Sequence, residues 1–187
     1  MSVAHSKPVS IHTPFAVKRA VSKRGYAKTF AAQPVGSGAE LISVEADLTR
    51  GLHAFSIVGL ADKAVEEARD RVSAAIRHSG IKPPKQQNKR IVLSLSPADL
   101  KKEGSHYDLA IALAYLIAAD DLAPLTEEML FAGELALDGT LRNVRGVLPQ
   151  VLAAKRRGIK TIFVPPGNAR EALLADARAR ARDGGDL

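Results

Sequence analysis

The sequence of 187 residues contains no cysteine, which excludes disulfide bonds, thiolate metal ligands and a cysteine nucleophile. Aromatic residues make up only 4% of the chain, which argues against a surface on which nucleotide bases stack. No apolar run approaches the ~18 residues that a membrane crossing needs. The histidines show no metal-ligand spacing and predict no metal site; they are His5, His12, His53, His78 and His106.

Positive charge is concentrated at the start of the chain. Residues 1–28 hold six of the 27 basic residues and none of the 20 acidic ones, so the remainder is close to neutral. The segment 1–25 has no hydrophobic periodicity and predicts a disordered basic extension. Three interpretations stay open: an arm for nucleic acid or an anionic surface, an organellar transit segment, or a leader without a role. It lacks the long apolar stretch of a secretory signal.

The composition, 46% hydrophobic, suits one compact domain, which we place at residues 26–175, with a frayed tail at 176–187. Strand-like and helix-like patterns are mixed along it, which predicts an α/β (α+β) two-layer fold with helices packed on a mixed sheet. The expected strands are 26–35, 40–48, 54–58, 91–96 and 160–165, with a hairpin over 130–144 that turns at Asp138-Gly139. The expected helices are 62–79, capped by Asp62, and 109–119, 146–157 and 167–182.

A polar loop, residues 99–105, runs directly into the helix at 109–119, which is apolar on all sides and therefore a buried central helix. A helix N-terminus favours anions and developing negative charge, so a loop mounted there is the first candidate site. Its candidate binding residues are Asp99, Lys101, Lys102 and Asp108.

Further candidates lie outside that loop. Ser105 is expected to be the N-cap of the central helix, and Arg142 and Arg145 are candidate phosphate ligands. Glu134 is expected to pair with Arg142 across the hairpin, which offers a structural role for that arginine. The basic segment 82–90 is either a solvated connector or a contact for phosphate.

Several stretches resemble the YifB/ComM family of magnesium-chelatase-like AAA+ ATPases. They are Val44–Asp62 (VEADLTRGLHAFSIVGLAD), Pro97–Leu109 (PADLKKEGSHYDL), Gly133–Gly139 (GELALDG) and Val144–Pro149 (VRGVLP). The resemblance runs in order over roughly residues 26–175. It implies the fold of the Lon protease catalytic domain, with helices on one face of a mixed sheet and a left-handed βαβ crossover.

The family comparison also marks what this sequence does not contain. No Gly-x-x-x-x-Gly-Lys-[Ser/Thr] motif occurs, so the phosphate-cradling loop of an ATPase is missing. ATP and Mg²⁺ are therefore implied only for a motor domain absent from this chain, which we expect to be truncated before it. In Lon-type proteases a lysine activates a serine. Here the base position falls on Leu148 and the nucleophile position on His106, or on Ser105 with one residue skipped.

The sequence thus predicts a non-proteolytic N-terminal module and no enzyme activity for this chain alone. The resemblance implies a cytoplasmic role in DNA processing, as branch migration in natural transformation, beside a hexameric AAA+ motor or within a homo-oligomer. No membrane partner is expected. The alternatives are a stand-alone nucleic-acid-binding module that uses residues 1–28 with the segment 82–90, and a residual serine hydrolase.

Overall fold

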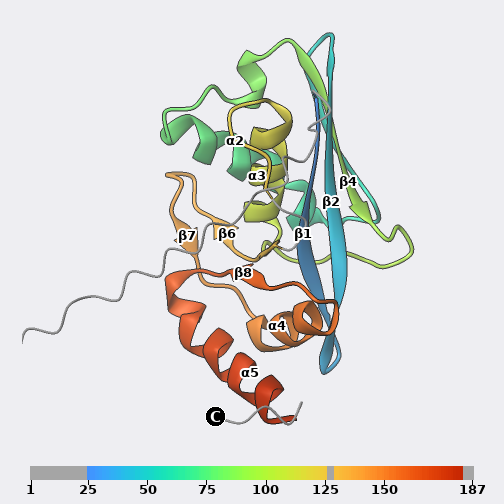
Figure 1. Cartoon of the computed structure of the whole chain (residues 1–187). Helices are drawn as coiled ribbons and strands as arrows, with labels where there is room; N and C mark the ends of the chain where they lie inside the picture. The colour runs from blue at the N-terminus through green and yellow to red at the C-terminus, as the bar shows by residue number, and fades with distance from the viewer. Residues whose placement is uncertain (1–24, 126–128, 183–187) are drawn as a thin grey trace, which may run out of the picture.

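The computed structural model describes residues 25–125 and 129–182, and Figure 1 shows its arrangement. The strands are β1 (Tyr26–Val35), β2 (Gly38–Arg50), β3 (Ala54–Val58), β4 (Lys89–Ser96), β5 (Met129–Phe131), β6 (Glu134–Leu135), β7 (Leu141–Arg142) and β8 (Thr161–Phe163). The helices are α1 (Lys63–Glu66), α2 (Ala68–His78), α3 (Asp108–Ala118), α4 (Val147–Arg156) and α5 (Ala169–Arg182), with short 3₁₀ turns at Pro84–Gln86 and Pro166–Asn168. Within the described residues, no helix is both long and apolar enough to cross a membrane.

Six strands form one mixed sheet in the order β3-β4-β2-β1-β5-β8, and β6 and β7 form a separate two-stranded ribbon. The pairs β1–β2 and β2–β4 are antiparallel, whereas β3–β4, β1–β5 and β5–β8 are parallel. The chain passes through α1 and α2 between the parallel neighbours β3 and β4, and through α4 between the parallel neighbours β5 and β8, so each pair forms a βαβ unit. The prediction of a mixed α/β fold is confirmed.

The two faces of the sheet are covered differently. Ala31 and Ala32 are consecutive and fully buried residues of β1, so their side chains point to opposite faces. Ala31 belongs to the main core, which α2 and α3 close, whereas Ala32 packs with Val147 and Val151 of α4. Over most of the sheet, helices therefore cover one face only, as the resemblance implied. At the turn end of the β1–β2 hairpin, α4 covers the other face, and Figure 1 shows α4 beside this end of the hairpin.

Local sequence signals set many of the boundaries. The strands predicted at 26–35 and 54–58 have those bounds, and the expected hairpin of the first two strands is present. Asp62 caps the next helix as predicted, by accepting a hydrogen bond from the backbone N–H of Val65 at 2.8 Å. The predicted helix over 62–79 is nevertheless interrupted at Glu67, which divides it into α1 and α2.

Two other predictions need correction. The hairpin expected over 130–144 is limited to β6 and β7, because residues 129–131 pair with β1 and β8 in the main sheet. The segment expected to be a buried strand at 160–165 is the short edge strand β8, where Phe163 is 47% exposed. The last helix, α5, pairs with α4 through Asp176 and Lys155 at 2.5 Å.

The junction of α4 with α5 depends on one buried amide. Asn168 receives a hydrogen bond from the N–H of Val144 at 2.9 Å and donates to the carbonyl of Val144 at 2.9 Å. Replacing Asn168 with alanine leaves both backbone groups unpaired, so we expect a loss of about 2 kcal/mol in the free energy of unfolding, measured by urea denaturation. The exposed Asn88 is the matched control, and its replacement by alanine should cost less than about 0.5 kcal/mol. Equal losses at the two positions would contradict this role.

Candidate functional site

The loop between β4 and α3, residues 97–107, is tied to the turn that follows β3. The backbone N–H of Lys102 donates to the carbonyl of Leu60 at 3.0 Å, and the N–H of Asp62 donates to the carbonyl of Lys102 at 2.9 Å. The Asp62 carboxylate, which caps α1, also accepts from the N–H of Gly104 at 3.3 Å. One carboxylate therefore fixes both a helix start and the loop, which gives the loop a defined shape.

A second set of contacts ties the loop to β1. Gln33 is buried, and its side-chain oxygen accepts hydrogen bonds from the Tyr107 hydroxyl and, at 3.0 Å, from the backbone N–H of Glu103. Burial raises the pKa of Tyr107, and the charges of Asp62 and Glu103 raise it further, so the hydroxyl remains a donor at all ordinary pH values. Tyr107 thus acts as a structural donor in the core.

Lys102 is not the exposed ligand that the sequence predicted. Its side chain is fully buried, and its ammonium group donates to the carbonyl of Pro97 within the same loop. Burial lowers the pKa of Lys102, which the charge of Asp99 opposes. The prediction was wrong because an amphipathic lysine can pack its aliphatic stem under a loop, and composition alone does not show where the chain folds over it.

Asp108 is likewise inaccessible to a ligand, with no exposed surface. Arg71 of α2 donates to it twice, from Nε at 2.6 Å and from Nη2 at 2.9 Å, and the N–H of Leu135 donates at 3.1 Å. The hydrogen bond to Asp108 raises the pKa of Arg71, while burial raises the pKa of Asp108 against the opposing effect of Arg71. Asp108 is the first residue of α3, and it serves as an anchor between α2, α3 and β6.

Ser105 does not cap α3. The helix begins after Tyr107, which makes no side-chain capping bond, and the Ser105 hydroxyl instead donates to the carboxylate of Glu134. Glu134 also receives a bond from Arg142 at 3.4 Å, which confirms the predicted cross-strand pair. The serine therefore has a carboxylate partner, already engaged by an arginine, and no amine among its hydrogen-bond partners in the described residues.

His106 is the most unusual residue of the loop. The ring is 8% exposed, stacks at 4.1 Å between centroids on Tyr107, and has a buried Nε2 atom without a hydrogen-bond partner in the described residues. Burial lowers its pKa to about 4, against smaller opposing effects of the Ala32 backbone and the charge of Asp62. A neutral imidazole is therefore enclosed in the core at neutral pH.

The position that the resemblance assigns to the protease base is occupied by a partly buried leucine. Leu148 lies in the first turn of α4, packs in the apolar cluster of α4 and α5, and its backbone N–H donates to Glu171 at 2.9 Å. A leucine side chain accepts no proton. Among the described residues, no lysine amine is hydrogen-bonded to Ser105, because the buried Lys102 donates to the carbonyl of Pro97 and Ser105 donates to Glu134.

The other predicted ligands are on the surface. Asp99 and Arg145 are exposed, and Lys101 is exposed and pairs with Glu103 at 2.6 Å, which raises the pKa of Lys101. Arg142 is 65% exposed beside Glu134. These residues remain candidates for contact with a partner, whereas Lys102 and Asp108 do not. Among the residues that the structure describes, no cluster of three or more histidine, aspartate or glutamate residues is placed to hold a metal ion.

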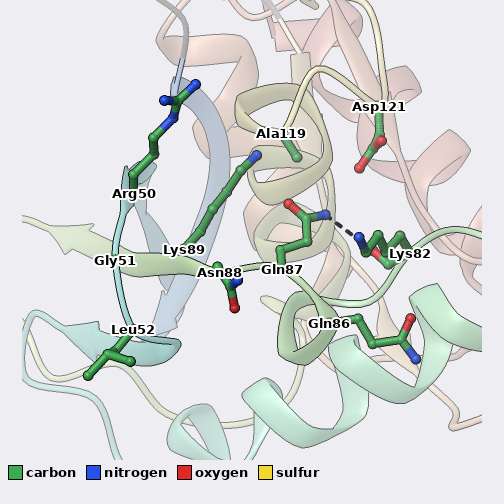
Figure 2. A pocket seen from close by; sticks show the side chains of 10 residues that line it. All are labelled: Arg50, Gly51, Leu52, Lys82, Gln86, Gln87, Asn88, Lys89, Ala119 and Asp121. Carbon is green, nitrogen blue, oxygen red and sulfur yellow. Dashed lines mark hydrogen bonds between the residues drawn. The ribbon is translucent and has the colours of Figure 1, made fainter.

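A separate basic hollow lies at the end of the sheet away from the β1–β2 turn, and Figure 2 shows its lining. Its volume is about 810 Å³, and its basic residues are Arg50, Lys82 and Lys89, which come from β2, the connector to β4, and the start of β4. Sequence analysis singled out the segment 82–90 but missed Arg50. Arg50 is recognised as part of this surface only through its cross-strand pairing with Lys89. That pairing depends on the register of β2 and β4, which local sequence patterns do not give.

Comparison with known proteins finds sequence relatives of this chain. Residues 44–168 match the family described as subunit ChlI of Mg-chelatase. The chain is 43% identical over 141 residues to competence protein ComM of Haemophilus influenzae, and 44% identical over 129 residues to the uncharacterized protein YifB of Escherichia coli. It is 30% identical over 149 residues to Lon protease 1 of Sorangium cellulosum.

The matched region covers most of this chain but a small part of each relative. It is 75% of the chain for ComM, 68% for YifB and 78% for the Lon protease, against 27%, 25% and 18% of those proteins. The chain therefore spans less than a third of the length of these relatives.

Proposed function

The chain belongs to the family of subunit ChlI of Mg-chelatase, and from this premise we propose that it is the non-proteolytic N-terminal module of a YifB/ComM-type ATPase. The module assembles beside an AAA+ motor, in a hexamer or another homo-oligomer, and takes part in cytoplasmic DNA processing. ATP and Mg²⁺ belong to the motor in this proposal, because the present sequence has no phosphate-cradling loop.

The observation that carries the non-proteolytic part is the environment of Ser105. A serine becomes a nucleophile when an adjacent base takes its proton. Ser105 donates to Glu134, which Arg142 also engages, and the buried Lys102 donates to the carbonyl of Pro97. Leu148 occupies the position that corresponds to the base. These contacts favour a loop kept for its shape and its exposed charges.

The lack of an activated serine gives a direct prediction. A fluorophosphonate probe should label the protein no more than it labels the variant Ser105→Ala, because the carboxylate that accepts from the Ser105 hydroxyl, Glu134, is already engaged by Arg142. The measurement is in-gel fluorescence after incubation at pH 7 and pH 9. Labelling that disappears in Ser105→Ala would revive the serine hydrolase and contradict the proposal.

The DNA-processing part rests on the similarity to a competence protein. It predicts that the chain binds a YifB- or ComM-type protein from which the matching N-terminal region has been removed, and that it changes that motor's activity. Co-elution in size-exclusion chromatography and the rate of branch migration on a synthetic junction are the two measurements. We expect stable co-elution and a faster reaction when the chain is added.

Charge reversal tests which face meets the motor. Reversing Lys101 in the loop together with Arg145, which directly precedes α4, should weaken co-elution because both are exposed, whereas reversing Arg156 and Arg157 at the end of α4 should not. If the chain neither co-elutes with the motor nor changes the motor's activity, the proposed role as a module is wrong. Equal effects of the two double variants would contradict the use of the loop.

A further inference from the structure

The basic hollow carries more positive charge than its structural role explains. Arg50, Lys82 and Lys89 line it, and Asp121, which follows α3, is the only acidic residue of the lining. Gln86, Gln87 and Asn88 contribute amide groups to the same surface (Figure 2). A concave surface with net positive charge and several amides suits an anion that accepts many hydrogen bonds.

Two of these positively charged residues are cross-strand neighbours on adjacent strands of the sheet. Arg50 of β2 and Lys89 of β4 are directly paired in the antiparallel register, so their side chains leave the same face, and Figure 2 shows them extending in the same direction. Like charges directly opposite each other destabilise a strand pair. Neither side chain has an ion-pair or hydrogen-bond partner within residues 25–125 and 129–182. An anion bound between them relieves this repulsion.

The described part of the chain begins at the same end of the sheet as the hollow. The carbonyl of Gly25 accepts a hydrogen bond from the N–H of Leu48 at 2.7 Å, two residues before Arg50 on β2. The sequence as a whole has a formal net charge of +7, and this excess of positive charge favours a polyanion over a single small anion as the ligand.

We propose that the basic hollow binds the phosphate backbone of duplex DNA, with Arg50 and Lys89 as the paired ligands of one phosphate and Lys82 beside the next. This inference takes its choice of polyanion from the proposed function in DNA processing. The absence of aromatic side chains in the lining favours duplex over single strands, which bind by base stacking. One exposed apolar residue, Leu52, is too little for a membrane-binding face, which needs a continuous apolar surface.

The experiment measures binding of the full chain to a fluorescent 20-base-pair duplex by anisotropy, from about 50 to 200 mM salt. The double variant Arg50→Gln, Lys89→Gln should weaken binding at least roughly tenfold at the lowest salt and reduce the salt slope by about two. Its thermal midpoint should stay equal or rise, because a repulsive pair is removed. The matched control is Arg156→Gln, Arg157→Gln, the same charge change on α4, which packs at the turn end of the hairpin.

The outcomes separate this inference from the proposed function. Equal affinity of the two double variants, or no duplex binding by the unmodified chain, overturns the hollow as a DNA site. The motor experiment then decides the module role by itself. Tighter binding to vesicles containing phosphatidylserine than to the duplex, lost in Arg50→Gln, Lys89→Gln, overturns DNA in favour of a membrane. If a variant without residues 1–24 still loses affinity for the duplex when Arg50 and Lys89 are replaced, this result supports the hollow as the primary site.

Discussion

Replacing Asp108 with alanine should lower the free energy of unfolding by about 3–5 kcal/mol. The substitution leaves Arg71, whose side chain is only 19% exposed, without its two short hydrogen bonds, and it leaves the buried N–H of Leu135 unpaired. A buried ion left without its partner is far more costly than an exposed one. Urea denaturation followed by circular dichroism measures the effect directly.

A second, more exposed ion pair of the same arginine provides the control variant. Glu67 also pairs with Arg71, at 3.9 Å, but its side chain is 55% exposed. Glu67→Ala should therefore cost less than about 1 kcal/mol, as exposed pairs do. The double variant Arg71→Met, Asp108→Ala should recover part of the loss, because no unpaired charge remains. If Asp108→Ala and Glu67→Ala cost the same, the anchoring role of Asp108 is wrong.

Acid should destabilise the protein through His106. Burial lowers the pKa of this ring to about 4, whereas the unfolded chain has the ordinary value of about 6.5. Between these two pH values the unfolded state binds a proton that the folded state does not, so stability is full above about pH 6.5 and falls as the pH is lowered. From pH 7 to pH 4.5 the loss should be about 2–3 kcal/mol.

His106→Phe isolates this contribution, since the ring is kept and its titration is removed. Urea denaturation of both proteins at pH 7 and pH 4.5 gives the change in the free energy of unfolding of each protein over this interval. The titration of other groups cancels in the difference between the two changes. We expect the phenylalanine variant to lose about 2–3 kcal/mol less than the natural chain over this interval. Parallel pH profiles would show that His106 titrates normally, and therefore that it is accessible to water in the folded state.

The boundaries of most elements follow from short-range signals, and the structure confirms many of them. Glycine in the left-handed region closes the β1–β2 hairpin at Gly36 and follows α2 at Gly80, where the sequence predicted these ends. Buried and more exposed side chains alternate along most of β2, as expected for a strand with one face against the core. The pairing of β5 was missed, because a strand of three residues carries too few positions for a pattern.

The sequence predicted a candidate site in the loop before α3, but it did not predict the contacts within that loop. The loop before α3 is a dense polar network, as its composition indicated, yet two of its predicted ligands, Lys102 and Asp108, are buried. The partner of Asp108 is Arg71, 37 residues earlier, and that of Ser105 is Glu134, 29 residues later. Such pairings depend on how α2 and β6 pack against the loop, which no local pattern contains.

By itself, the sequence determined the absence of cysteine chemistry, the lack of an ATPase phosphate loop, the order of strands and helices, and the likeness to YifB and ComM. These properties are local, because each depends on residue identity or on spacings of a few residues. The tertiary structure alone decided which charges are enclosed, that α4 covers the second face of the sheet, and that Arg50 is set beside Lys89. Burial and cross-strand register arise from the packing of segments far apart in the chain, so they appear only once those segments are in contact.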